Sequence, residues 1–124
     1  MLGRTDAIAN VAVKDLAAAR TFYQRTLGLT PVDGQESEVI VFTSGQTRLF
    51  VYRSEYAGTN KATTVSWVVD DVGKTVAELA QKGVVFEHYD MPGLTRHGDV
   101  HTGGGMQVAW FKDPDGNILS VVNG

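Results

Sequence analysis

The hydrophobic and polar positions of this 124-residue chain follow the same order twice. The first half has an alternating apolar run at residues 7–13, then Asp15, then apolar residues at helical spacing. The second half has a similar run at residues 63–69, then Asp71, then another helical set. Alternation indicates a strand, and an Asp just before an amphipathic stretch is typical of a helix N-cap. The pattern therefore predicts an internal duplication.

Each half continues with three further predicted strands. In the first half the helix ends at Gly28, and strands are predicted at residues 29–32, 38–43 and 47–53, with turn signals at Asp33-Gly34 and Ser44-Gly45. In the second half the helix ends at Lys82-Gly83, and strands are predicted at residues 84–89, 106–112 and 118–122, the last two joined by Asp113-Pro114-Asp115-Gly116-Asn117. We therefore expect an α+β fold: a single domain over residues 1–124, with module 1 at 7–53, a connector at 54–62 and module 2 at 63–122.

The stretch from residue 90 to residue 105 shows neither the alternation of a strand nor the apolar spacing of a helix. Its length and its three consecutive glycines, 103–105, predict a loop without regular structure, either a lid, a binding loop or a segment that is disordered without ligand. His97 and His101 lie four residues apart, but Gly98 between them makes a helix improbable and leaves a metal site without fixed geometry. His101 stays a candidate for a hydrogen bond to a ligand or to the backbone.

Composition narrows the class of protein. The chain is 43% hydrophobic and 20% charged, with a formal net charge of −3 and no cysteine. The absence of a basic run argues against nucleic-acid or anionic-membrane partners, and the absence of cysteine excludes disulfides and thiolate metal ligands. No apolar run approaches the ~20 residues of a membrane span, and the first residues lack a signal-peptide pattern. We expect a cytoplasmic protein.

Several motifs resemble those of one superfamily. They are Val13-Lys14-Asp15-Leu16, Phe22-Tyr23, Leu27-Gly28-Leu29 and, near the end, Phe111-Lys112-Asp113-Pro114-Asp115-Gly116-Asn117. In order, and at this chain length, they resemble the glyoxalase, bleomycin-resistance and extradiol-dioxygenase superfamily, the vicinal oxygen chelate proteins. The resemblance implies two βαβββ modules whose sheets curl into an open cleft, usually in a homodimer. It does not imply one reaction, because the scaffold carries many functions.

The resemblance also implies where a metal would be held. Metal-using members place two ligands in each module, one seven residues before the capping Asp and one on the last strand. Here these positions are Ile8 and Thr64, together with Ser120 and, by a looser assignment, Phe50. None is a side chain that divalent cations favour. We therefore expect no metal and no cofactor, and the metal-dependent glyoxalase and dioxygenase chemistries are disfavoured.

Strand alternation predicts which side chains face away from the helices and line a cleft. The mixture of aromatic, hydroxyl, amide and guanidinium groups is typical of a small-molecule pocket. Alternatives are that Phe50 and Trp110 are plain core and that Arg48 pairs with Glu38, while Trp67 is interpreted as core. The predicted ligand-binding residues are Asn10, Arg48, Phe50, Tyr52, Thr64, Ser66, His101, Val108, Trp110 and Ser120.

Two functions remain open at this point, and a third needs no cleft. The first is a metal-free protein that binds or sequesters a hydrophobic or aromatic natural product such as an antibiotic. The second is an enzyme of the same fold, a lyase, isomerase or dioxygenase-type protein, in which Arg48, Tyr52 or His101 stabilises charge or transfers a proton. The third is a structural or regulatory partner domain. No pair of residues defines an acid and a base, so no catalytic residue is assigned.

Overall fold

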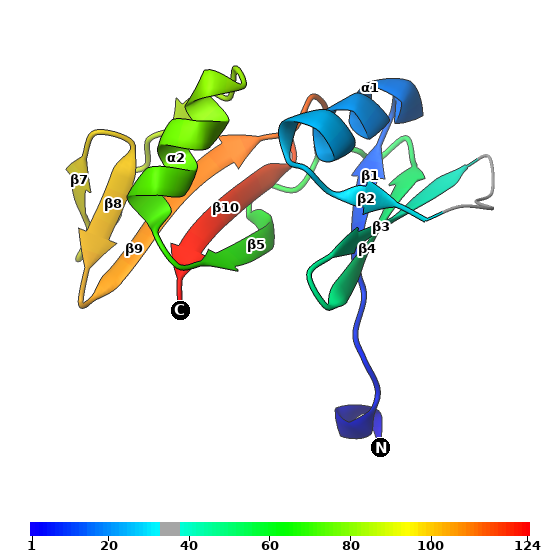
Figure 1. Ribbon diagram of the computed structural model, residues 1–124, viewed down its shortest axis with the longest axis horizontal. Coiled ribbons are helices and arrows are strands. Elements are labelled where there is room, and N and C mark those ends of the chain that lie inside the picture. The colour runs from blue at the N-terminus through cyan, green and yellow to red at the C-terminus, as the bar shows by residue number, and fades with distance from the viewer. Residues whose placement is uncertain (33–37) are drawn as a thin grey trace. The chain divides into compact units, whose positions relative to one another are not determined.

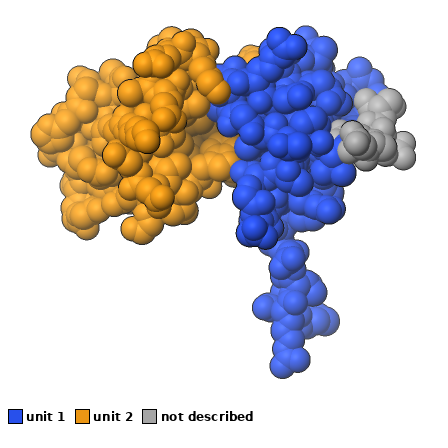
Figure 2. All heavy atoms as spheres, viewed as in Figure 1, with its two compact units in different colours: residues 1–58 blue, residues 59–124 orange. Residues whose placement is uncertain are grey.

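The computed structural model describes residues 1–32 and 38–124, so the turn predicted at Asp33-Gly34 lies outside the described residues. The chain divides into two compact units, residues 1–58 and 59–124 (Figure 2). Within these described ranges, each unit contains one mixed, open β-sheet and one α-helix (Figure 1). Within the described residues, no helix combines the length and the apolar character that crossing a bilayer requires.

Unit 1 contains the first predicted module. Its elements are η1 (Leu2–Arg4), β1 (Ala9–Val13), α1 (Leu16–Thr21), the π-helical segment η2 (Phe22–Thr26), β2 (Thr30–Pro31), β3 (Val39–Ser44) and β4 (Thr47–Arg53). The sheet order is β1-β4-β3-β2, and β1 runs parallel to β4. Asp15 caps the helix, because its Oδ1 accepts a hydrogen bond from the Ala18 N–H at 3.1 Å. The predicted cap is therefore confirmed.

One face of the unit 1 sheet packs against its helix. Tyr23 is fully buried and lies 5.9 Å from the Phe42 ring, centroid to centroid. The other core residues are Val11, Val13, Ala19, Ile40, Leu49 and Val51 from this face and helix, and Leu29 from the segment between η2 and β2. The opposite side of the strands is open, since the residues that alternate with these are exposed or half-buried.

Unit 2 repeats the order and adds to it. Its elements are β5 (Thr63–Val69), α2 (Val72–Gln81), β6 (Phe86–Glu87), β7 (Thr95–His97), β8 (Val100–Gly103), β9 (Met106–Lys112) and β10 (Ile118–Asn123). The order is β5-β10-β9-β8-β7, with β6 also paired to β9, and β5 runs parallel to β10. Asp71 caps α2 by accepting a hydrogen bond from the Lys74 N–H at 3.0 Å. Both halves therefore contain the predicted strand-helix-strand-strand-strand sequence.

The segment predicted as an unstructured loop is in large part a β-hairpin. Strand β7 pairs antiparallel with β8, and β8 extends the sheet at β9. Gly98, at φ 63°, forms the turn between them. The prediction of a loop over residues 90–105 was wrong here because the three β7 side chains are all exposed and show no alternation. Only residues 88–94 connect β6 to the hairpin without strand structure.

The unit 2 sheet buries side chains on both faces. Toward α2 it carries Phe86, Ala109, Phe111, Leu119 and Val121, which are buried with Val72, Val76 and Leu79 of the helix. On the other face, Val108, Trp110 and Ile118 form a second cluster, against which Tyr89, Leu94 and Val122 pack. This second cluster positions the candidate site.

Gly103 makes a close backbone approach that a methyl group would prevent. A Cβ at this position would lie 2.1 Å from the carbonyl oxygen of Gly93. We expect Gly103→Ala to lower the free energy of unfolding by about 1–3 kcal/mol, as overpacking does, because backbone must move. Urea denaturation measures this. Gly73→Ala in α2 is the control: its Cβ would meet only the Asp71 carboxylate, at 3.6 Å, and an equal loss in both variants would contradict the steric explanation.

Candidate functional site

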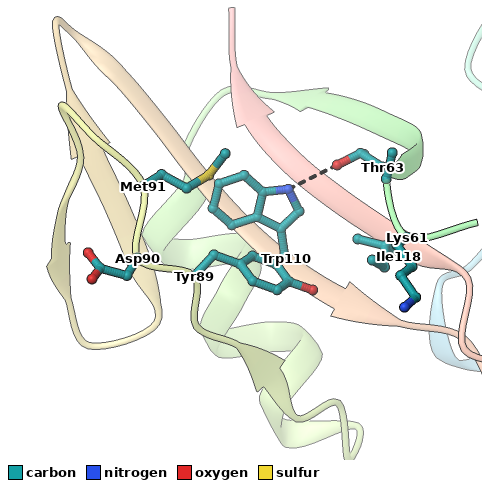
Figure 3. A pocket seen from close by; sticks show the side chains of 8 residues that line it. Lys61, Thr63, Tyr89, Asp90, Met91, Trp110 and Ile118 are labelled. Carbon is teal, nitrogen blue, oxygen red and sulfur yellow. Dashed lines mark hydrogen bonds between the residues drawn. The ribbon is translucent and has the colours of Figure 1, made fainter.

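Unit 2 contains a pocket on the side of its sheet that faces away from α2. Its cavity volume is about 560 Å³. The walls come from the start of β5 and the residues before it, from the segment after β6, and from β9 and β10 (Figure 3). The lining residues are Lys61, Ala62, Thr63, Tyr89, Asp90, Met91, Trp110 and Ile118.

Trp110 forms the central wall of this pocket. The residue is only 8% exposed. Its indole N–H donates a hydrogen bond to Thr63 Oγ1 at 3.1 Å (Figure 3). The Tyr89 and His101 rings contact it in edge-to-face geometry, with centroid distances of 5.2 Å and 4.9 Å. The indole is therefore held in one orientation, and its N–H is already used.

A β-bulge decides which threonine reaches the pocket. Thr63 is in register with Ile118, and Val65 is in register with Leu119, so Thr64 is the extra residue between them. The prediction that Thr64 faces the site is corrected to Thr63, because the bulge shifts the alternation by one residue. Thr64 instead accepts a hydrogen bond from Asn60 Nδ2 at 3.5 Å.

The hydroxyl of Thr63 should contribute to holding the indole. We expect Thr63→Val, which keeps the shape and removes the acceptor, to lower the free energy of unfolding by about 1 kcal/mol. The indole N–H resonance of Trp110 should also shift in the proton NMR spectrum. Thr64→Val is the matched control, since its hydroxyl makes only a long, exposed contact. If the two variants behave alike, the indole is held by packing alone.

His101 binds the backbone rather than facing solvent. It is 1% exposed, and its Nε2 accepts a hydrogen bond from the Tyr89 N–H at 3.1 Å. A neutral imidazole that accepts at Nε2 carries its proton on Nδ1, and this buried N–H has no hydrogen-bond partner among the described residues. Of the two roles left open by the sequence, the structure shows the backbone contact. His101 thereby positions Tyr89 beside Trp110.

Tyr89 presents a buried hydroxyl group. Its oxygen has no hydrogen-bond partner within the described parts of the chain. Burial raises the pKa of the phenol, the Glu87 carboxylate raises the pKa further, and Lys112 partly opposes both. The hydroxyl is therefore protonated at neutral pH and available as a donor. Sequence reasoning missed Lys61 and Met91 as site residues because they lie outside the predicted strands. It missed Tyr89 because the strand predicted at residues 84–89 ends at Glu87 in the structure.

Three other predicted residues of unit 2 lie on the same face without lining the pocket. Ser66 and Ser120 are in register, and their hydroxyl oxygens are 2.7 Å apart in a hydrogen bond. Val108 is buried in the cluster with Trp110. These three residues lie on the face that carries Trp110, where side chains of the cluster fill part of the space.

The predicted residues of unit 1 lie on the open face of its sheet. Asn10 pairs in register with Phe50, and Arg48 and Tyr52 are exposed on the same strand as Phe50. The alternative that Arg48 pairs with Glu38 is wrong. Glu38 lies opposite the end of β4, where its carboxylate accepts two hydrogen bonds from the guanidinium of Arg53, at 2.7 Å and 2.6 Å.

The positions that would hold a metal in this architecture do not suit a cation. The register supports Phe50 as the counterpart of Ser120, because Phe50 pairs with Asn10 as Ser120 pairs with Ser66. The side chains of Ile8 and Phe50 have no atom that can ligate a metal ion, and the Ser120 hydroxyl is already hydrogen-bonded to Ser66 within unit 2. Among the described residues, no group of three or more His, Cys, Asp or Glu side chains could hold a metal ion.

Comparison with known proteins identifies the family. The family model of the Glyoxalase/Bleomycin resistance protein/Dioxygenase superfamily matches residues 4–121. The chain belongs to this superfamily. The recognition made from the sequence motifs is therefore confirmed, as is the α+β fold class. No curated protein sequence matches the chain.

Solved structures of the superfamily resemble the chain over nearly its full length. A glyoxalase family protein from Enterococcus faecalis is 17% identical, with a TM-score of 0.74 and 99% and 100% of the two chains covered. Lactoylglutathione lyase from Agrobacterium tumefaciens is 18% identical, with a TM-score of 0.72 and coverage of 98% and 94%. The bleomycin-binding protein from Streptomyces verticillus, complexed with copper(II)-bleomycin, is 24% identical, with a TM-score of 0.70 and coverage of 100% and 99%. These likenesses show the fold.

Proposed function

We propose that this protein binds a flat aromatic or hydrophobic natural product, such as an antibiotic, in the unit 2 pocket and does so without a metal. The observation that carries the proposal is the pocket itself. A cavity of about 560 Å³ lies within the range typical of small-molecule sites, and its central wall is an indole fixed by Thr63. Met91 and Ile118 add apolar surface beside the ring (Figure 3).

Binding is favoured over catalysis by the groups that are present. A binding role for this fold is supported by the similar structures of bleomycin-binding proteins. The lyase alternative is supported by likeness to lactoylglutathione lyase, which shares only the fold at this identity. At the positions where metal-using members of the superfamily hold a cation, the side chains of this chain are poor metal ligands. The raised pKa of the Tyr89 phenol suits a hydrogen-bond donor rather than a general base.

Isothermal titration calorimetry with a panel of flat antibiotics, bleomycin included, tests this proposal. We expect saturable binding by at least one compound, with loss of Trp110 fluorescence on binding. The Trp67→Phe variant isolates that emission, since Trp67 and Trp110 are the two tryptophans of the chain. Compounds recovered after incubation should be chemically unchanged. The absence of any saturable heat would remove the proposal, and a chemically altered compound would favour the enzyme.

We further propose that the protein acts as a homodimer in the cytoplasm. The open face of the unit 1 sheet supports the dimer, because Tyr52 is 37% exposed there and Phe50 is only half-buried. The lack of cysteine suits a reducing compartment. Size-exclusion chromatography with light scattering should give twice the 13.4 kDa mass of the chain. A monomer at micromolar concentration would contradict the dimer and would leave the unit 2 pocket unaffected.

A further inference from the structure

The unit 2 pocket contains two hydrogen-bond donors without partners. Within the described residues, the Lys61 ammonium forms no ion pair or hydrogen bond, and the Tyr89 hydroxyl has no partner either. Figure 3 shows Lys61 and the Tyr89 hydroxyl on the same side of Trp110. The Asp90 carboxylate lies at the opposite side and points away from the indole (Figure 3). The polar end of the pocket therefore offers donors and a positive charge.

We propose that the pocket recognises aromatic carboxylates: flat ring systems whose carboxylate oxygens accept hydrogen bonds from the Tyr89 hydroxyl and the Lys61 ammonium. This rests on the proposed binding function and specifies the class of ligand. A carboxylate has two oxygens that only accept, which matches two donors. Hydrogen bonds to an ionised group are about twice as strong as neutral ones, so they favour this ligand over a neutral analogue.

The remaining contacts of the pocket disfavour cationic and neutral ligands relative to anionic ones. The indole N–H is taken by Thr63, so it cannot provide a competing donor elsewhere in the pocket. A cationic ligand would bring its charge toward Lys61 and would leave the buried Tyr89 hydroxyl without an acceptor. A neutral hydrocarbon would also leave that hydroxyl unpaired. An anionic oxygen group satisfies both donors at once.

The two donors differ in how far they are exposed to an incoming ligand. The hydroxyl oxygen is buried, whereas Lys61 is exposed and lies in the segment just before β5. The four-carbon chain of Lys61 is flexible, so it can place its ammonium on the incoming carboxylate. The apolar part of the ligand then lies against Trp110, Met91 and Ile118.

Calorimetry with three matched compounds tests the inference: 2-naphthoate, its neutral amide 2-naphthamide, and the cation 2-naphthylmethylammonium. We expect 2-naphthoate to bind at least about tenfold more tightly than the amide, and the cation to bind most weakly. Lys61→Met and Tyr89→Phe should each weaken 2-naphthoate binding by about three- to tenfold while changing the affinity for the amide by less than about twofold. Lys74→Met, an exposed lysine on α2 outside the pocket, is the control.

The outcomes separate this inference from the binding function. Equal affinity for the carboxylate and the amide, both lost in Trp110→Leu, would overturn the carboxylate preference and keep the binding function. Tighter binding of the cation would do the same. An equal loss for all three compounds in Tyr89→Phe would mean that the hydroxyl supports the pocket without selecting the charge of the ligand, which also overturns the inference. If none of the compounds binds, the carboxylate inference fails; the antibiotic panel then decides the function separately.

Discussion

Replacing Trp110 with alanine is expected to lower the free energy of unfolding by about 3–5 kcal/mol, the usual cost of truncating a buried aromatic side chain. The indole is the largest side chain of the second cluster of unit 2 and also donates to Thr63. Its removal empties the space between Tyr89 and His101. Chemical denaturation followed by circular dichroism measures the loss, and calorimetry should find no ligand binding.

A second variant keeps this prediction testable if the alanine protein does not fold. Trp110→Phe retains an aromatic ring against Tyr89 and His101 and removes the hydrogen bond to Thr63 together with part of the buried volume of the indole. We expect a smaller destabilisation and measurable but weaker binding. Trp67→Phe is the matched control, because Trp67 lies on the strand β5 outside the pocket. If Trp110→Ala leaves both stability and binding unchanged, the indole is neither core nor binding wall.

The second large effect is expected at Asp113. This carboxylate is 5% exposed and accepts hydrogen bonds from the Asp115 N–H at 3.0 Å, the Asn117 N–H at 2.9 Å and Asn117 Nδ2 at 2.8 Å. Asp113→Ala would remove the acceptor of all three hydrogen bonds, two of which come from the buried Asn117. Because each hydrogen bond to a charged group contributes about 1.5–3 kcal/mol, we expect the free energy of unfolding to fall by roughly 3 kcal/mol or more in urea denaturation.

Asp113→Asn provides the graded comparison. Its amide keeps one acceptor oxygen for the two backbone N–H groups, and Asn117 can rotate its own amide to accept from the new NH₂ group. We expect about half of the loss seen with alanine. Equal losses in the two variants would show that the negative charge, rather than the set of hydrogen bonds, holds the β9–β10 turn.

The features that the sequence determined are local. The strand and helix periods placed β1, α1, β4, β5, α2, β9 and β10 within a few residues. Asp15 and Asp71 were identifiable as caps because an N-cap bonds a backbone N–H only three residues away. The family motifs at Asp15 and Asp113 are local in the same sense, which is why both the superfamily and its fold could be recognised from residues alone.

The composition of the site was decided by tertiary structure. The bulge that brings Thr63 to Trp110 depends on how β5 pairs with β10, and no pattern within β5 reveals it. Strand β8 of the β7–β8 hairpin pairs with β9, a strand that follows it in the chain, whereas the side chains of β7 show no alternation. Glu38 meets Arg53 instead of Arg48 through the register of β3 and β4. The periodicity of side chains can be recognised within a single segment. Strand register, and the side-chain contacts that depend on it, arise only when segments distant in the sequence pair.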